Sequence, residues 1–327
     1  MAIKLGINGF GRIGRYLTRL LAEEDGFELV AVNARASNED LAHLLKYDSV
    51  HGRFVDVRPT DKGFNMAGKD VIVTRNAPGE WNWGELGCDM VVETTGKFTD
   101  RESCEKHMAC GAKKVIISAP SKDADYTVVM GVNDTNLTAD HDIVSNASCT
   151  TNCLAPVAKV INDNFGIKHG IMTTVHSYTM SQRVLDGSHK DIRRARACAM
   201  NMVPTTTGAA RAVGLVLPEL AGKLDGMSIR VPTANVSLVD LVCELDKSAT
   251  VESVNAALKT AANESMGFSE EPLVSVDYMG STFGGVVDAA LTRVMDNTQL
   301  KLIIWYDNEA GFTNQLLRLM RLVGTMM

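Results

Sequence analysis

The sequence predicts an α/β protein of two domains, a doubly wound parallel sheet followed by an α+β domain with a mixed or antiparallel sheet. Three observations support this fold class. The chain has 327 residues, more than the roughly 100–200 of one typical domain. Its first half alternates short β-branched strands with helical segments, as parallel βαβ units do. After about residue 147, longer strand-like segments follow one another in hairpin fashion, so we place the domain boundary there.

The first domain, residues 1–147, begins with a strand, a helix and a second strand within about 30 residues. Its later strands are short apolar runs bounded by Gly, Asn or Lys, which is typical of strands buried in a parallel sheet. The predicted strands are Ala2–Ile7, Phe27–Val32, Asp70–Thr74, Met90–Glu93, Lys114–Ser118, Thr127–Gly131 and Asp142–Ser145. The predicted helices are Gly11–Glu23 and Glu39–Lys46.

The second domain, residues 148–310, contains longer strands, and an amphipathic helix over Gly311–Val323 follows it. The predicted strands are Ile171–Ser177, Gly226–Val231, Asn235–Leu245, Leu273–Asp277, Gly285–Asp288 and Leu300–Tyr306. Periodicity alone does not say where the last helix packs.

Composition excludes several classes of protein. A hydrophobic fraction of 45% rules out a disordered chain. A net charge of −6 and an isoelectric point near 5.7 argue against a general nucleic-acid binder. No apolar run is long enough to span a membrane, and the first residues do not resemble a signal peptide. Seven scattered cysteines, without metal-site spacing, predict a reduced cytoplasmic protein without a metal.

The letters GFGRIG at residues 9–14 form a GxGxxG motif that follows a predicted strand and opens a predicted helix. Gly9 permits the tight turn, and Gly11 lets the backbone approach a pyrophosphate at the helix N-terminus. Gly14 lets the helix pack closely on the strand. The motif in this context predicts a dinucleotide-binding, Rossmann-type domain; the alternative is a tight turn that binds no ligand.

The end of the second strand bears on which dinucleotide binds. NAD sites normally carry Asp or Glu there, to accept a hydrogen bond from the ribose 2′-hydroxyl. This chain has Ala34 and Arg35 instead. A guanidinium would attract a 2′-phosphate, so we expect NADP or dual use. The alternative is that Arg35 points to solvent.

Cys149 and His176 are the candidate catalytic pair. The letters SNASCTTNC at residues 145–153 join a strand to a helix, with Ser148 as its N-cap and Cys149 in the first turn. A helix N-terminus favours the nucleophilic thiolate. His176 ends a strand, and beside a thiolate it would form an ion pair and act as base or acid. Pro156 should kink the helix, and most cysteines are simply buried thiols.

A basic run at residues 193–196 precedes hydroxyl groups and a glycine at 205–208. Guanidinium groups, hydroxyls and a glycine amide are what phosphate oxygens bind. Arg230 adds a second candidate phosphate ligand. The alternative is a solvated basic loop.

Together these motifs resemble glyceraldehyde-3-phosphate dehydrogenase, most closely its phosphorylating bacterial and plastid-type members with NADP-type cofactor sites. The similarity runs over essentially the whole chain in the family's order, and the block around Cys149 is highly specific. It rests on INGFGRIGR at 7–15, HLLKYDSVHGRF at 43–54, SNASCTTNCLAP at 145–156, TTTGAA at 205–210 and WYDNEAGF at 305–312.

The resemblance implies phosphorylating oxidation of glyceraldehyde 3-phosphate to 1,3-bisphosphoglycerate through a Cys149 thioester, with His176 as acid and base. It implies that substrate and inorganic phosphate are bound by Ser148, Thr150, Thr179, Arg194, Thr207, Gly208 and Arg230. It implies that the dinucleotide is bound by Gly9, Gly11, Arg12, Ile13, Gly14, Ala34, Arg35, Arg75, Gly96, Ser118, Ser188 and Asn308. It also implies a homotetramer, a mobile S-shaped loop over about 178–202, and a C-terminal helix, 311–327, that completes the first domain.

Two departures from NAD-specific members point to NADP. Ala34 replaces their Asp, and Gly187-Ser188 replaces their Leu-Pro in the S-shaped loop. Removing the carboxylate and adding Arg35 and Ser188 would accommodate a 2′-phosphate, while NAD activity is expected to persist. A third departure, Phe312 in place of Tyr, keeps the ring and should matter little.

Two other functions stay open at this point. The first is erythrose-4-phosphate dehydrogenase, although that branch departs from the intact Thr207-Gly208 motif. The second is a non-catalytic NADP-binding redox sensor that uses Cys149. Glycolytic oxidation and anabolic reduction would use the same residues, so both directions are open.

Overall fold

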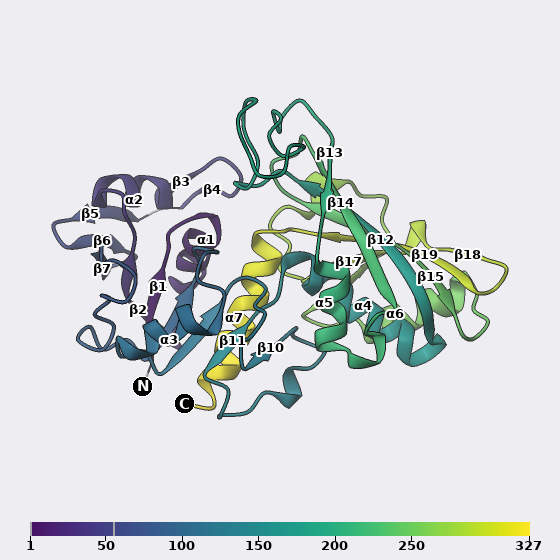
Figure 1. Ribbon diagram of the computed structural model, residues 1–327, viewed down its shortest axis with the longest axis horizontal. Helices are drawn as coiled ribbons and strands as arrows, with labels where there is room; N and C mark the ends of the chain where they lie inside the picture. The colour runs from purple at the N-terminus through teal and green to yellow at the C-terminus, as the bar shows by residue number, and fades with distance from the viewer. Residues whose placement is uncertain (1, 55) are drawn as a thin grey trace. The chain divides into compact units, whose positions relative to one another are not determined.

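The computed structural model describes residues 2–54 and 56–327, and the chain forms two compact units (Figure 1). The first unit comprises Met1–Val128, Asn136–Ala147 and Leu316–Met327. The second comprises Val129–Thr135 and Ser148–Gln315. Helix α7 (Ala310–Gly324) contributes residues to both units.

The first unit is built on a sheet with the order β10-β11-β9-β8-β1-β2-β7-β6-β5 in the described part of the chain. Its strands are β1 (Ile3–Asn8), β2 (Phe27–Asn33), β5 (Val57–Thr60), β6 (Gly63–Met66), β7 (Lys69–Thr74), β8 (Met90–Glu93), β9 (Lys114–Ile117), β10 (Tyr126–Thr127) and β11 (Ile143–Ser145). Its remaining elements are α1 (Arg12–Leu21), α2 (Asn38–Lys46), α3 (Arg101–Ala109) and the ribbon β3 (Tyr47–Asp48) with β4 (Gly52–Arg53).

Parallel pairing extends from β10 to β7, and the chain winds outward from β1 in both directions. This confirms the predicted doubly wound sheet. Strands β8 and β9 are buried along their whole length, as expected for strands covered on both faces. The strand order reverses at β1, so the carboxyl ends of β1 and its neighbours are where this fold class binds ligands.

Two details of the first sheet differ from the prediction. The antiparallel hairpin β5–β6 extends its edge and was not predicted. The strand predicted over Thr127–Gly131 is wrong beyond Thr127. There the Asn133 side chain accepts a hydrogen bond from the backbone N–H of Val129 at 2.9 Å, which replaces a strand partner with a local turn.

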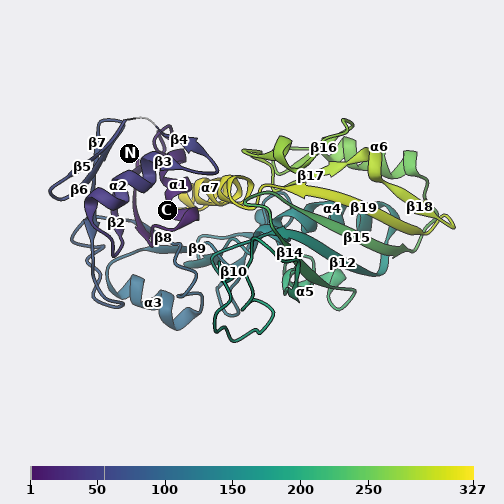
Figure 2. The same cartoon turned by 90° about the horizontal axis from the view of Figure 1, so that it is seen from above.

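The second unit contains a mixed sheet with the order β13-β14-β12-β15-β19-β17-β16, and β18 pairs with β19. Its strands are β12 (Ile167–Ser177), β13 (Val203–Thr206), β14 (Leu224–Val231), β15 (Ser237–Leu245), β16 (Met266–Ser269), β17 (Gly285–Asp288), β18 (Arg293–Met295) and β19 (Gln299–Tyr306). Its α-helices are α4 (Cys149–Phe165), α5 (Ala209–Val216) and α6 (Val251–Ala261). Figure 2 shows these three helices beside the long strands.

Burial alternates along β15, which is the pattern of a sheet with one covered face. Helix α4 packs on β12, β15, β17 and β19, so it covers that face, and it continues through Pro156 to Phe165. The predicted mixed sheet is confirmed, but the strand predicted over Leu273–Asp277 is wrong. Asp277 accepts a hydrogen bond from the N–H of Val274 at 2.8 Å, and a 3₁₀ turn forms over Ser275–Tyr278.

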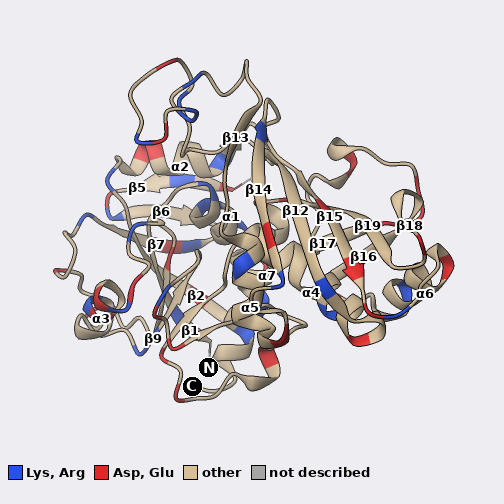
Figure 3. Cartoon of the chain, turned by 45° about the vertical axis from the view of Figure 1, so that its right-hand side comes forward, with Lys and Arg blue, Asp and Glu red and all other residues tan. Residues whose placement is uncertain are grey.

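Basic and acidic residues are both distributed along the two units (Figure 3). None of the helices in the described residues is long and apolar enough to cross a membrane.

Candidate active site

The glycine-rich turn after β1 leaves open space at the N-terminus of α1. Gly9 has a φ of +98°, and a Cβ there would lie 2.8 Å from Thr95 Cγ2. A Cβ on Gly14 would lie 2.6 Å from the carbonyl oxygen of Gly9, so helix and turn are in close contact. A Cβ on Gly11 would meet no atom within 4 Å. The turn therefore has room for the pyrophosphate that the motif predicts at Gly11.

A cavity of about 510 Å³ opens beside this turn, within the first unit. Of the sequence-predicted cofactor residues, Gly9, Ala34, Arg35 and Arg75 line it. Lys97 is a third basic lining residue, and none of the described lining residues is Asp or Glu. The cavity thus joins a pyrophosphate cradle to a basic surface, which suits a phosphorylated nucleoside.

The other predicted cofactor residues of this unit lie around the turn rather than on the cavity wall. Arg12 donates two hydrogen bonds to the Asp48 carboxylate, at 2.5 and 3.0 Å. Burial would raise the pKa of Asp48, but Arg12 and two backbone N–H groups hold it well below its usual range. Ile13 follows in α1, Gly96 has a φ of +66°, and the Ser118 N–H donates to Glu93 O at 3.0 Å.

Arg75 is held at the cavity by the chain that follows β2. Its guanidinium donates to Ala36 O at 2.7 Å and to Asn38 Oδ1 at 2.8 Å. The backbone N–H of Ala34 donates to Thr74 O at 3.0 Å, which ties the ends of β2 and β7 together. Ala34, Arg35 and Arg75 therefore lie on the cavity wall, whereas Ser188, the third position predicted to accommodate a 2′-phosphate, belongs to the second unit.

The second unit brings Cys149 and His176 together. Ser148 caps α4 by accepting a hydrogen bond from the Thr151 N–H at 3.0 Å, which places Cys149 in the first helical position. His176 lies near the end of β12, and its Nε2 is 3.6 Å from Cys149 Sγ. The carboxyl end of a strand and the start of a helix thus form a thiol–imidazole pair at hydrogen-bond range for sulfur.

Two groups compete for the other nitrogen of His176. Nδ1 lies 2.7 Å from Ser177 O and 2.7 Å from Arg230 Nη1, because β12 and β14 pair His176 directly with Arg230. A carbonyl only accepts and a guanidinium only donates, so Nδ1 can bond to one of them at a time. When Nδ1–H donates to Ser177 O, Nε2 presents its lone pair to the Cys149 thiol.

Burial and neighbouring groups shift the pKa values of both partners. Burial, followed by the charge of Arg230, lowers the pKa of His176 to about 3. Desolvation raises the pKa of the Cys149 thiol, although Arg230 and hydrogen bonding with Thr150 lower it in part. Burial thus opposes the charge on each partner, whereas Arg230 and Thr150 favour the thiolate, and the thiolate–imidazolium pair stays a prediction.

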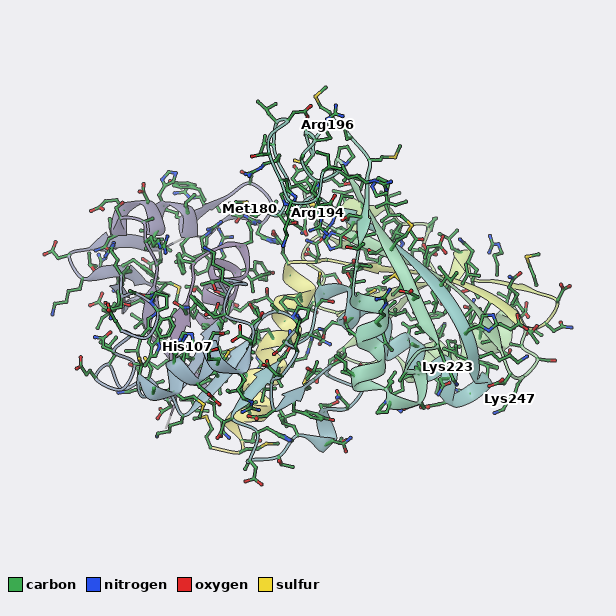
Figure 4. The ribbon with its side chains drawn as sticks, in the orientation of Figure 1. His107, Met180, Arg194, Arg196, Lys223 and Lys247 are labelled. Atoms are coloured by element: carbon green, nitrogen blue, oxygen red, sulfur yellow. The ribbon has the colours of Figure 1, made fainter. Side chains whose placement is uncertain are left out.

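The predicted phosphate ligands lie on several segments of the second unit. Arg194 donates to Thr205 Oγ1 at 2.9 Å and lies 3.5 Å from Asp191. Figure 4 shows Arg194 nearer the strands and Arg196 farther out on the same loop. Arg196 instead pairs with Asp186 at 2.8 Å on the surface. Only part of the basic run is therefore directed into the fold.

The remaining predicted phosphate ligands are at loop and helix ends. The Thr207 hydroxyl accepts from the Ala209 N–H at 3.2 Å, and Gly208 is the N-cap position of α5. The Thr179 hydroxyl lies 2.9 Å from Ser181 Oγ. These positions supply hydroxyl and amide donors of the kind that bind phosphate oxygens.

Comparison with known proteins decides the family. Residues 3–101 match the family model described as glyceraldehyde 3-phosphate dehydrogenase, NAD binding domain, and residues 148–308 match the model of its C-terminal domain. A glyceraldehyde-3-phosphate dehydrogenase of Geobacillus stearothermophilus is 57% identical over 98% of this chain and 97% of its own length. The chain belongs to the glyceraldehyde-3-phosphate dehydrogenase family.

Other relatives of the family share the full length of the chain. A glyceraldehyde-3-phosphate dehydrogenase of Priestia megaterium is 55% identical over 99% of both chains, and one of Mycolicibacterium smegmatis is 50% identical over 99% of both. The chain is thus an oxidoreductase of this family, with an N-terminal NAD-binding domain and a C-terminal domain.

The structure of this glyceraldehyde-3-phosphate dehydrogenase family member also shows a buried residue that the sequence analysis missed. The Tyr306 hydroxyl lies 2.8 Å from both Thr150 Oγ1 and Thr174 Oγ1, and its ring meets that of His176 edge-on at 5.8 Å. The side chain links the start of α4 to β12 and packs against the ring of His176. Tyr306 lies in the motif WYDNEAGF at 305–312, and this motif was the sequence signal that could have identified it.

Asn308 and Ser188, the two predicted cofactor ligands in the second unit, have different surroundings. The Oδ1 of Asn308 accepts from Ser177 Oγ at 2.8 Å and Ser237 Oγ at 3.0 Å, which leaves its amide nitrogen as the donor. The carbonyl of Ser188 accepts from Arg183 at 2.8 and 3.0 Å on the S-shaped loop. Met180, on the same loop, is 92% exposed (Figure 4).

Proposed function

We propose that this chain catalyses the phosphorylating oxidation of D-glyceraldehyde 3-phosphate to 1,3-bisphosphoglycerate. The observation that carries the proposal is the 3.6 Å approach of Cys149 Sγ to His176 Nε2 in a chain of this family. A neutral imidazole can accept the thiol proton as the sulfur attacks the aldehyde carbon. It then returns this proton to the former carbonyl oxygen, which gives a hemithioacetal on Cys149 and a neutral His176.

His176 is then the base for the oxidation step. It receives the proton of the hemithioacetal hydroxyl while hydride leaves the same carbon, and a thioester remains on Cys149. The nicotinamide, when bound, supplies the hydride acceptor. Inorganic phosphate attacks the thioester carbon, the carbon–sulfur bond breaks, and the thiolate recovers its proton. The Cys149 N–H, at the helix N-terminus, donates to the oxygen on which negative charge develops.

The anion-binding residues hold the substrate phosphate and inorganic phosphate. Support comes from their chemistry, since guanidinium, hydroxyl and amide groups donate to phosphate oxygens. The proposed set is Ser148, Thr150, Thr179, Arg194, Thr207, Gly208 and Arg230.

We propose further that the chain uses NADP as well as NAD. The basic cavity with Arg35, Arg75 and Lys97 supports this, since a 2′-phosphate would find cations and no carboxylate among the described lining residues. Ala34→Asp combined with Ser188→Pro should lower NADP affinity relative to NAD. An unchanged ratio of the two dissociation constants would assign 2′-phosphate recognition to other residues.

The assembly is proposed to be a homotetramer in the cytoplasm. Apolar side chains on the S-shaped loop and on the sheet of the second unit are exposed in the single chain, among them Met180 and Ile171. Exposed apolar groups of this kind are typical of surfaces that a second copy covers.

The deciding experiment measures initial rates of glyceraldehyde 3-phosphate oxidation with NADP and with NAD, each with and without inorganic phosphate. A phosphate-dependent rate supports the proposal, and the ratio between the dinucleotides tests the cofactor argument. Activity on erythrose 4-phosphate instead would identify the sister enzyme. Dinucleotide binding without turnover on either aldehyde would identify a redox sensor.

A further inference from the structure

The carboxyl edge of the first sheet carries one polar residue at the end of each of four adjacent parallel strands. Glu93 ends β8, Asn8 ends β1, Asn33 ends β2 and Thr74 ends β7. The strand register places each one directly beside the next. Their side chains form one continuous hydrogen-bonded row, and two of its members, Asn8 and Asn33, line the dinucleotide cavity.

Every hydrogen bond in this row runs in the same direction. Thr74 Oγ1 donates to Asn33 Oδ1 at 3.0 Å, and Asn33 Nδ2 donates to Asn8 Oδ1 at 2.9 Å. Asn8 Nδ2 donates to Glu93 Oε2 at 2.5 Å. The row therefore ends on the Glu93 carboxylate as its final acceptor.

The far end of the row is held by a backbone group. The N–H of Asn76 donates to Asn33 Oδ1 at 2.9 Å, and a backbone N–H cannot act as an acceptor. The amide oxygen of Asn33 must therefore face Asn76, and its nitrogen must face Asn8. The row has one orientation that satisfies all of its members.

Glu93 is almost completely buried. Among the described residues, the hydrogen-bond partners of its carboxylate all donate to it. Besides Asn8, it accepts from the N–H of Thr95 at 2.6 Å and from the Thr95 hydroxyl. The same hydroxyl accepts from the Lys97 N–H at 3.1 Å, so its own proton points to Glu93. Thr95 and Lys97 also line the cavity.

His107 is the fourth donor to Glu93, at 3.3 Å from Nε2 (Figure 4 labels this residue). The indole N–H of Trp83 donates to His107 Nδ1 at 3.0 Å, which puts the imidazole proton on Nε2. The ring of Trp81, another cavity-lining residue, stacks on His107 at 3.8 Å. Side chains from β1, from the turn after β8 and from α3 thus converge on one carboxylate.

We propose that Glu93 is a positioning residue for the dinucleotide: it sets the direction of the hydrogen-bonded row that contributes Asn8 and Asn33 to the cavity wall. It does not need to touch the cofactor. It orders Asn8, Asn33 and the turn through Thr95, so the wall is preorganised before the ligand arrives. This inference rests on the proposed dinucleotide-dependent function.

Glu93→Gln tests the direction of the row because it changes neither size nor shape. The glutamine oxygen can accept from Thr95, but its NH₂ group then faces the Asn8 NH₂ and the His107 N–H. Rotation of the Asn8 amide would not remove this clash of donors. It would turn the Asn8 NH₂ toward the Asn33 NH₂, whose orientation is fixed by the Asn76 N–H. We expect the dissociation constant of NAD from the free enzyme to rise about tenfold, with the rate at saturating NAD changed less than about twofold.

Asp125→Asn is the matched control. Asp125 is a partly buried carboxylate of the first unit that accepts from the Ile143 N–H at 2.7 Å and from Arg101, but it does not line the cavity. Both variants should lower the melting temperature, whereas only Glu93→Gln should weaken NAD binding in calorimetric titration. Should Glu93→Gln fail to fold, Thr74→Val removes the first donor without changing charge and should raise the constant about threefold.

The outcomes separate this inference from the proposed function. A wild-type chain that binds neither NAD nor NADP overturns both. A wild-type chain that binds NAD, with Glu93→Gln or Thr74→Val binding it equally well, overturns the inference alone. Equal weakening by Asp125→Asn would show a general loss of stability and would also overturn it.

Discussion

At the scale of single residues, Cys149 and His176 show how burial shifts the pKa values of a reactive pair. Desolvation raises the pKa of the thiol and lowers the pKa of the imidazole to about 3. Arg230 favours the thiolate but opposes the imidazolium, so it cannot stabilise both charges of an ion pair. Burial therefore opposes the ion pair, while Arg230 favours only its negative partner.

Replacing Cys149 by serine tests its role as nucleophile. A hydroxyl is a much weaker nucleophile than a thiol, so Cys149→Ser should lower turnover by roughly a thousandfold or more. Dinucleotide binding, measured by titration, should be unchanged. Cys153→Ala is the control, since Cys153 lies one turn further along α4, fully buried, and should retain activity. Full turnover by Cys149→Ser would contradict the thioester mechanism.

The buried His176 predicts a specific dependence of stability on pH. Its pKa is about 3 when folded and roughly 6.5 when unfolded, so between these values only the unfolded chain binds the proton. Stability from this group is therefore present above pH 6.5 and is lost as the pH falls. Between pH 7.5 and pH 5 the loss should be about 2 kcal/mol.

Denaturant unfolding at the two pH values measures this loss. The variant His176→Asn cannot take up the proton, so its free energy of unfolding should fall by about 2 kcal/mol less than that of the wild type over the same interval. If both proteins lose the same stability, the imidazole is not held neutral by burial.

At the scale of elements, the turn from β1 to α1 contains one glycine that packing requires and another that leaves space for a ligand. Gly14→Ala would press a Cβ against the Gly9 carbonyl, at 2.6 Å before relaxation, and should lower the free energy of unfolding by about 1–3 kcal/mol. Gly11→Ala would meet no protein atom, so it should change stability by less than about 1 kcal/mol.

The same two variants differ in what they do to the ligand. A Cβ on Gly11 would fill the space left for a pyrophosphate, so Gly11→Ala should weaken NAD binding strongly in a direct titration while the protein stays folded. Wild-type affinity in Gly11→Ala would show that the pyrophosphate does not lie against this turn.

At the scale of the whole molecule, the exposed apolar side chains of the second unit predict association. Ile171 is 67% exposed on β12, and Met227 is 40% exposed on the neighbouring strand β14, where it pairs with Thr173. We expect light scattering to give a mass about four times the 35.3 kDa of the chain. A mass of one chain at micromolar concentration would contradict the tetramer.

Much of the fold could be predicted from periodicity because strands buried on both faces are short, mainly apolar runs. Strands β8 and β17 begin and end at the predicted residues. Predictions failed where a side chain, not a neighbouring strand, bonds the backbone, as at Val129 and Val274. Such local hydrogen bonds compete with strand pairing, and the pattern of apolar residues in the sequence does not reveal them.

The sequence by itself determined the two-domain α/β architecture, the glycine turn, and Cys149 and His176 as the candidate pair. These follow from local patterns: a period of two or 3.6, a motif between strand and helix, and an N-cap before a cysteine. Tertiary structure alone decided the surroundings of the pair and the row from Thr74 to Glu93. Both depend on burial and on contacts between strands distant in sequence, where low polarity and neighbouring donors set the charge and direction of each group.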